Sequence, residues 1–418
     1  MSSYDPDRMS TTSAERWTRL ALVLAIAFAA LNAVNAVNKG GDAEVFLEGG
    51  RRLVQAEPLY EGSSAAAGFI GPPFQAVFFA PFAAVAASSP IVAKLLWHVT
   101  GVACLALGVV FTGRTWAAAR ADLGLPFRPT FPTSFAPLLA VLLPLQTNFE
   151  HQNMNPLLLA LIASATWMLV RGSSGAAGAL LGVAIALKAF PALLLIVLVC
   201  RQHWRAAAAA VAVAIALTLL PLPLYGVEGY VHLLRDFQRL ASSGFPARGN
   251  NQSLFAALDR LMGPGDADFI HQAEGTTLIA YCVIAGVLLL ALTIVAIRAR
   301  APAIATLTMQ VFAAVVVAIL LSPIAWDHYW VLTFPALVVL YDSRDERLLG
   351  GGLGPFIFLG TALLITGVSR VLLGRRLFSL GRSLSPYAIA GLSIVVALIW
   401  ICVKVARREP SPGAGVNE

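Results

Sequence analysis

The sequence predicts an all-α integral membrane protein, a polytopic bundle of about 12 transmembrane helices with juxtamembrane helices in the first outer loop. Of its 418 residues, 58% are hydrophobic and only 12% are charged, and the mean hydropathy is +0.77. Soluble domains have about 25% charged residues, so this chain has half the usual means of covering a surface that faces water. Apolar runs of about 18 or more residues, long enough to cross a bilayer, recur along the chain.

The apolar runs define the expected spans, several of which are short for a bilayer. In order they are 17–36, 91–113, 133–149, 153–170, 174–187, 189–200, 206–223, 275–297, 303–321, 329–341, 350–369 and 385–404. We expect one membrane domain over 17–404, with an N-terminal tail over 1–16 and a C-terminal tail over 405–418.

Lysines and arginines in short loops predict the orientation, because such loops tend to stay in the cytoplasm. A cytoplasmic N-terminal tail, with Arg8, Arg16 and Arg19, places five later basic segments on the same side. They are TGRTWAAARADLGLPFR, RQHWR, RARA, DSRDER and KVARR. This agreement predicts a multi-pass plasma membrane protein with both tails inside.

One basic segment disagrees with this orientation. RVLLGRRLFSLGR (370–382) places four arginines outside. Either the last two spans are misassigned, or these arginines have an anionic partner on the outer side.

The segment 68–90 is apolar enough to span, but counting it as a crossing would reverse every later loop. Pro72, Pro73 and Pro81 interrupt it and remove helix donors. We therefore expect a juxtamembrane or half-inserted element on the outer face. Irregular backbone at membrane depth is tolerated only against protein or a water-filled cavity, so this element should line a cavity.

Several classes of function are unsupported. The formal charge is +7, but no basic stretch is interleaved with aromatic residues on a soluble domain, so nucleic-acid binding is not expected. The sequence has no Walker A loop, no HExxH motif and no CxxC pair, and its four cysteines lie far apart in apolar runs. We predict no metal site and no cofactor.

Asp42 lies in the first outer loop, a few residues after an apolar run ends. Glu44, Glu48, Arg51 and Arg52 follow it at helical spacing, with apolar residues between them, which predicts a short amphipathic helix at the interface. Asp42 would lie near the N-terminus of that helix, where the helix dipole favours a negative charge. A solvated loop residue is one interpretation; a general base that deprotonates an acceptor hydroxyl is the other.

Two amide-rich stretches are candidates for binding sugar hydroxyls, because amides both donate and accept hydrogen bonds. The first is HQNMN, with Gln152 and Asn155, between two spans. The second is ARGNNQSLF, with Asn250 and Ser253, in the longest loop. The alternative is that these residues only form turns.

The segment SPIAWDHYW places His328 beside a carboxylate and beside Trp326 and Tyr329, just after an apolar span. The aromatic residues alone are typical of an anchor at the membrane interface, whereas the histidine adds a group that titrates near neutral pH. Lys188 lies between two spans, where a lysine in hydrocarbon costs at least about 2.5 kcal/mol. It either snorkels to the interface or meets a lipid phosphate.

These motifs occur in an order that resembles glycosyltransferase family 87, mannosyltransferase-like membrane enzymes with the GT-C architecture. The order is Asp42, PLY, GPPFQAVFFAPF, the HQNMN turn, GAAGALLGVAIALKAFPALLLIVLVCRQHW, Asn250 to Ser253, and SPIAWDHYW. The resemblance covers about residues 17 to 341. Two positions depart from the family pattern, since His151 precedes Gln152 and Ala43 follows Asp42.

The resemblance implies an inverting enzyme that moves a hexose, typically mannose, from a polyprenyl monophosphate carrier to an acceptor on the extracytoplasmic side. It implies that Asp42 is the catalytic base, that His328 lies by the donor phosphate or the reacting centre, and that Gln152 and Asn155 belong to the family turn.

Together, the motifs and the resemblance predict a membrane hexosyltransferase whose partners are a lipid-linked sugar donor and a glycolipid or glycan acceptor. Cations would stabilise the departing phosphate, and the candidates besides His328 are Lys188, Arg375 and Arg376. Glu44, Trp326 and Tyr329 complete the expected substrate-binding set. The alternatives are a transporter or flippase for a lipid-linked saccharide, which should have polar residues through its spans, and a non-catalytic membrane scaffold.

Overall fold

The computed structural model describes residues 27–39, 41–64, 68–125, 131–242, 244–262, 270–271, 275–343 and 353–407. The predicted tail 1–16, the first ten residues of the span 17–36 and residues 408–418 lie outside the described residues. Residues 27–38, which include the rest of the first span, are helical. The described part is otherwise a helical bundle with one short antiparallel pair, β1 (Phe245–Pro246) and β2 (Ile270–His271).

The bundle consists of apolar helices whose residues match the predicted spans. They are α4 (Pro90–Asp122), α5 (Phe131–Ala140), α6 (Leu142–His151), α7 (Asn155–Val170), α8 (Ser174–Leu187), α9 (Leu194–Cys200), α10 (Trp204–Thr218), α13 (Gly275–Arg298), α14 (Ala303–Leu321), α15 (Phe334–Asp342), α17 (Leu353–Ala362) and α19 (Pro386–Ala406). Three short helical segments lie between them: the 3₁₀ helices η1 (Phe190–Leu193) and η2 (Asp327–Thr333), and the π-helix η3 (Leu363–Gly367).

The prediction of an all-α membrane protein is confirmed, but the count of spans is not. Within the described ranges, four helices (α4, α13, α14 and α19) are long and apolar enough to cross a membrane, and six if each of two bent helix pairs is one span. Other predicted spans are divided. The span 133–149 is interrupted at Val141 between α5 and α6, and 189–200 begins with the 3₁₀ turn η1.

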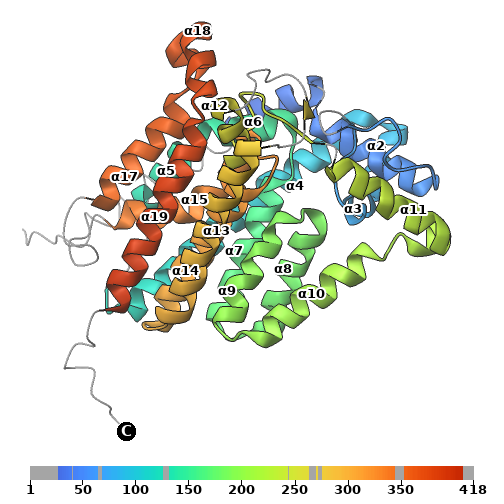
Figure 1. The fold of residues 1–418 in the computed structure, drawn as a ribbon. Coiled ribbons are helices and arrows are strands. Elements are labelled where there is room, and N and C mark those ends of the chain that lie inside the picture. Colours follow the sequence, from blue (N-terminus) through green and yellow to red (C-terminus); the bar gives the residue numbers. More distant parts are fainter. Residues whose placement is uncertain are drawn as a thin grey trace, which may run out of the picture.

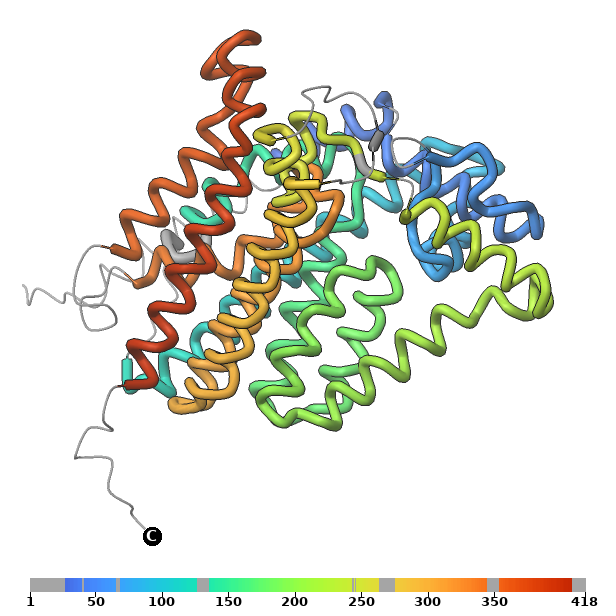
Figure 2. Tube along the Cα trace, viewed as in Figure 1, coloured from blue at the N-terminus to red at the C-terminus, as the bar shows by residue number. Residues whose placement is uncertain are grey.

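Helix α14 lies at the centre of the bundle and is buried along almost its whole length, packed against α4, α13 and α19. Figures 1 and 2 show α13, α14 and α19 running side by side. Helices α8 and α10 pack closely because Gly178 and Gly182 have no side chain. A Cβ at Gly178 would lie 2.2 Å from the Ala206 carbonyl oxygen, and one at Gly182 would lie 2.6 Å from that of Ala210.

Further helices gather at one end of the bundle, which we call the upper end as drawn in Figure 1. They are α2 (Asp42–Val54), α3 (Pro73–Ser88), α11 (Leu222–Ser242), α12 (Leu254–Met262) and α18 (Arg370–Ser383). The opposite end, where α4 ends and α14 begins, is the lower end.

The juxtamembrane element expected over 68–90 contains the 16-residue helix α3, as the prediction of juxtamembrane helices in this loop requires, and Pro72 and Pro73 lie at its start, where a missing N–H is unneeded. Two expectations about the connections need correction. The stretch 224–274 was expected to be a loop, yet α11 occupies much of it, bent by 91° from α10. The segment 370–382 is likewise helical, as α18. Kinks at Gly226 and Gly374 interrupt α11 and α18.

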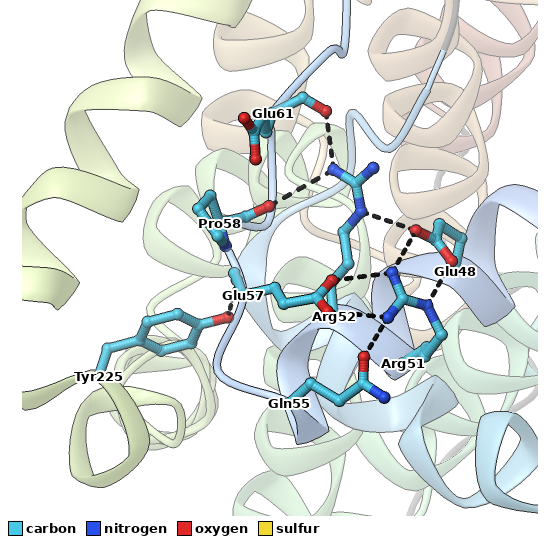
Figure 3. A network of polar contacts seen from close by, with 8 residues as sticks. All are labelled: Glu48, Arg51, Arg52, Gln55, Glu57, Pro58, Glu61 and Tyr225. Carbon is cyan, nitrogen blue, oxygen red and sulfur yellow. Dashed lines mark hydrogen bonds and ion pairs between the residues drawn. The ribbon is translucent and has the colours of Figure 1, made fainter.

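The predicted amphipathic helix after Asp42 is confirmed as α2, and an ionic network stabilises its C-terminal half (Figure 3). The Arg51 guanidinium binds Glu48 through Nη2 at 2.8 Å and Glu57 through Nη2 at 2.8 Å, while Arg52 Nε donates to Glu48 at 2.8 Å. The Arg51 hydrogen bond lowers the pKa of Glu48 to about 2. Tyr225 of α11 donates from its hydroxyl to the Glu57 carbonyl at 2.9 Å. The network therefore joins α2 to α11.

Candidate active site

Asp42 is the first residue of α2, and the chain before it passes close to the turn between α6 and α7. A Cβ at Gly41 would lie 3.1 Å from the Cα of His151, so only glycine fits this approach without displacing the turn. Asn153 Nδ2 donates to Asp42 Oδ2 at 2.6 Å. His328 Nε2 lies 3.6 Å from the same oxygen, and the Asp42 side chain remains 31% exposed. The carboxylate is thus oriented but accessible.

The α6–α7 turn positions Asn153 through its backbone. Gln152 caps α6 in the left-handed conformation, at φ 52°, and its carbonyl accepts a hydrogen bond of 2.7 Å from Trp97 Nε1. The Asn153 carbonyl accepts from Asn148 Nδ2 at 3.1 Å. With both carbonyls held, the Asn153 side chain extends toward Asp42.

Lys188 lies in the extended connection between α8 and η1, outside the predicted spans 174–187 and 189–200. Its Nζ donates to Asn153 Oδ1 at 3.1 Å and to Asn155 Oδ1 at 3.4 Å, and it lies 3.8 Å from the centre of the Tyr329 ring. Burial lowers the pKa of Lys188 to about 7, although the nearby Asp42 carboxylate opposes this shift. Asn153 therefore bridges the carboxylate and the ammonium group.

Asp42, Asn153 and Lys188 all line one cavity of about 480 Å³ at the upper end. Most of the remaining lining is apolar. It includes Val45, Phe46, Ile70, Pro72, Phe190, Leu193, Phe237, Ala318, Leu321, Pro323 and Ile324. The cavity thus combines a small charged region with a large apolar one, which suits a ligand that has a polar head and a hydrocarbon part.

Of the predicted site residues, Asp42, Lys188, Trp326 and Tyr329 line this cavity, and His328 is buried beside Asp42. Sequence reasoning missed Asn153, although it lies in the quoted HQNMN turn. The composition of the turn indicated an amide site but could not show which amide faces Asp42, because that depends on the left-handed Gln152.

Gln152 and Asn155 have structural contacts in place of the predicted exposure to a sugar. The Gln152 side chain is buried, and its Nε2 donates to the Lys94 carbonyl at 3.3 Å. Asn155 is fully buried and donates to the His328 carbonyl at 3.0 Å. Asn155 accordingly holds the segment of His328 against α7, and it contacts Lys188.

Glu44, Asn250 and Ser253 are not among the residues that line the cavity. Glu44 forms an ion pair of 2.7 Å with Lys94. Asn250 is exposed in a turn, and Ser253 is fully buried, where its Oγ accepts from the Ala256 amide at the start of α12. The Ser253 hydroxyl is therefore used in capping a helix.

The two arginines predicted to meet the phosphate are not in the cavity. Arg375 and Arg376 are exposed on α18, which Figure 1 shows projecting from the upper end on the side away from α2. The arginine of this segment that enters the protein is Arg382. Its guanidinium pairs with Asp327, and its Nε donates to the Gly249 carbonyl at 3.1 Å. Position along α18, rather than charge, decides which arginine turns inward.

The arrangement can support acid–base chemistry on an anionic amphiphile. Asp42 can accept a proton, and protonated Lys188 can stabilise negative charge within a few ångströms of it. In the parts of the chain that the structure describes, no three His, Cys, Asp or Glu side chains group so as to hold a metal ion.

The chain is similar in sequence to known glycosyltransferases. The model of glycosyltransferase family 87 matches residues 69–323. A polyprenol-phosphate-mannose-dependent alpha-(1-2)-phosphatidylinositol mannoside mannosyltransferase of Mycobacterium tuberculosis is 30% identical over 315 residues, 72% of this chain and 69% of the relative. Its namesake in Mycolicibacterium smegmatis is 29% identical over 335 residues, 71% of this chain and 69% of the relative.

Among solved structures, ArnT from Cupriavidus metallidurans bound to undecaprenyl phosphate aligns with a TM-score of 0.44 and 19% identity, over 91% of this chain and 77% of ArnT. The family match extends over more than half of the sequence and includes Gln75, Asn153 and Lys188. The chain therefore belongs to glycosyltransferase family 87.

Proposed function

We propose that this glycosyltransferase moves a hexose, mannose by its relatives, from a polyprenyl monophosphate carrier to a hydroxyl of a lipid or glycan acceptor. One observation supports this most directly: a carboxylate and an ammonium group, bridged by Asn153, lie together on an otherwise apolar cavity. The relatives quoted above are named for polyprenol-phosphate-mannose, a donor with a polar head and a long hydrocarbon chain.

In the proposed reaction, Asp42 accepts the proton of the acceptor hydroxyl while that oxygen attacks the anomeric carbon. The new carbon–oxygen bond forms opposite the bond to the phosphate, which breaks with inversion. The polyprenyl phosphate leaves with the electron pair of that bond. Protonated Lys188 stabilises the charge that develops on the phosphate oxygens.

Asn153 orients the base, and His328 lies beside it. Asn153 holds one carboxylate oxygen at 2.6 Å, and His328 Nε2 lies 3.6 Å from the same oxygen, too far for a hydrogen bond in this state. A small movement on substrate binding would bring the imidazole into hydrogen-bonding distance. We assign His328 the role of a neighbour that tightens around Asp42 when the cavity is filled.

The placement of charge supports one membrane orientation. Arg120 near the end of α4, Arg201 after α9 and Arg298 at the end of α13 lie at the lower end, and the positive-inside tendency favours a cytoplasmic lower end with the cavity at the extracytoplasmic face. Apolar side chains such as Phe190, Leu193 and Leu321 line the cavity where the polyprenyl chain would leave for the bilayer.

Transfer of label tests the proposal. Membranes containing the protein would receive polyprenyl-phosphate [¹⁴C]mannose together with an acceptor lipid extract, with Asp42→Asn as the matched variant. Label should reach the acceptor with the native protein and not with the well-expressed variant. Label that crosses the membrane while still attached to its carrier would contradict the proposal in favour of a flippase. Equal transfer by both proteins would remove Asp42 from the chemistry.

A further inference from the structure

Gln75 lies in the first turn of α3, on the wall of the cavity formed by residues 68–75. It is only 2% exposed, so its side chain is shielded from bulk solvent, and it lines the cavity. Across the described ranges, no donor or acceptor forms a hydrogen bond with its carboxamide, whereas its backbone N–H donates to the Pro72 carbonyl at 2.9 Å.

An unpartnered amide in such a place is unusual. Few buried polar groups lack a hydrogen-bond partner, and the carboxamide atoms of Gln75 are not among the fully enclosed atoms without one, so the small surface that they keep opens on the cavity. An apolar side chain of the same length would match the apolar lining around it. The carboxamide is therefore best explained by a partner that enters the cavity.

The neighbouring glycine provides the space in which this carboxamide lies. A Cβ at Gly71 would lie 1.4 Å from Gln75 Oε1, so the amide occupies the volume that any larger residue would fill. The backbone of Gly71 is fixed, because Tyr60 donates from its hydroxyl to the Gly71 carbonyl at 2.8 Å. Tyr60 is itself buried and packs on Phe69 and on Phe237, a residue of α11 that lines the cavity.

We propose that Gln75 binds hydroxyl groups of a sugar in the cavity and helps to select that sugar. A carboxamide donates two hydrogen bonds and accepts two, which matches the paired hydroxyls of a hexose. This inference rests on the proposed function. The sugar is either the hexose of the donor or a sugar of the acceptor, since both must approach Asp42.

Removal of the polar group without loss of volume tests the role. We expect Gln75→Met to lower kcat/KM roughly 10- to 100-fold, because sugar hydroxyls would lose their protein partner. Gly71→Ala should have a similar effect while keeping the amide, since the new methyl group displaces it. The control is Gln55→Met, which makes the same change at an exposed position of α2's C-terminus and should leave kcat/KM unchanged.

Stability separates a binding role from a structural one. Gln75→Met should unfold at the same or a higher temperature than the native protein, because the carboxamide forms no hydrogen bond with the described residues. A structural glutamine would instead lower the melting temperature along with activity. That result would overturn the proposal.

The two sources of the sugar are distinguished by KM and by binding without turnover. In the Asp42→Asn background, polyprenyl-phosphate mannose should raise the melting temperature more than bare polyprenyl phosphate does. If Gln75 contacts the donor, Gln75→Met erases that difference; if it contacts the acceptor, the difference persists and the acceptor KM rises in the active background. A failure of the transfer proposal would appear as an inactive native protein, while this binding comparison would still report on Gln75. No change in either KM or in the binding difference would overturn the inference.

Discussion

The two ends of the bundle use buried charge differently. At the lower end, Arg120 and Asp342 form a buried ion pair, and Trp116 Nε1 donates to Asp342 Oδ2 at 2.7 Å. At the upper end, Asp42 is 31% exposed and faces a cavity, and the amide of Gln75 meets no protein partner in the described residues.

Other charges of the lower end are also used in the fold. Asp122, near the end of α4, accepts hydrogen bonds from the backbone amides of Ile304 at 2.8 Å and Ala305 at 3.0 Å, which are unsatisfied donors at the start of α14. Arg201 donates to the carbonyls of Ala299 and Ala303, each at 2.8 Å. Asp42 and Lys188 at the upper end also line the cavity, so access to the cavity distinguishes these charges from structural pairs such as Arg120–Asp342 and Arg382–Asp327.

The largest effect should come from the base. Asp42→Asn keeps the size of the side chain but cannot accept a proton, so we expect turnover to fall by about 10²–10⁴-fold. The melting temperature should stay close to that of the native protein, because the residue is partly exposed. Initial rates of mannose transfer, set beside thermal unfolding in detergent, measure both. A large fall in melting temperature alongside the fall in activity would contradict the assignment of Asp42 to function rather than to the fold.

The reverse result is expected at the lower end. Asp342→Ala removes the buried carboxylate that pairs with Arg120 and accepts a hydrogen bond from Trp116 Nε1, which should cost about 3–5 kcal/mol of unfolding free energy. Activity per folded molecule should be unchanged. The control is Asp236→Ala, which removes the carboxylate of an exposed pair with Arg239 and should cost at most about 1 kcal/mol. Similar losses of unfolding free energy in the two variants would show that burial of the Arg120–Asp342 pair does not increase its contribution to stability.

Lys188 should give the reaction a pH dependence. In the proposed reaction the ammonium form stabilises the phosphate, and burial lowers the pKa of Lys188 to about 7, so kcat/KM should fall as the pH rises above about 7. Lys188→Arg stays charged at higher pH, so the decline should move upward or disappear. Lys188→Met should lose about 10²–10³-fold at pH 6. A flat profile for the native protein between pH 6 and 9 would exclude Lys188 from phosphate binding.

The smallest effect concerns the helix start at the lower end. Asp122→Ala removes the acceptor for two backbone amides of α14, and the loss of such a cap typically costs about 0.5–2 kcal/mol. We expect a lower melting temperature and an unchanged KM for donor. A raised donor KM would mean that the lower end communicates with the cavity through α14.

Local patterns predicted some elements well and others poorly. The helix after Asp42 was predictable because its charges and apolar residues alternate at helical spacing. Helices α11 and α18 were missed because each contains a glycine, and a glycine within a segment suggests a loop. Both helices are kinked at that glycine, which has a positive φ: 66° at Gly226 and 69° at Gly374. Arg375 and Arg376 were assigned to the phosphate for their charge, and only the course of α18 shows that Arg382 is the one that turns inward.

The sequence by itself determined that the chain enters a membrane, where its apolar runs lie, which end is basic and that Asp42 follows a span. These properties depend on composition and on neighbouring residues, since the free energy of transferring a segment into lipid is set mainly by the residues of that segment. Tertiary structure decided which polar groups meet. Asp42 and Asn153 are 111 residues apart, and their contact depends on the left-handed Gln152 and on the packing of α2 against the α6–α7 turn. Gln75 faces the cavity because Gly71 leaves room for it, a steric relation that no hydropathy pattern records.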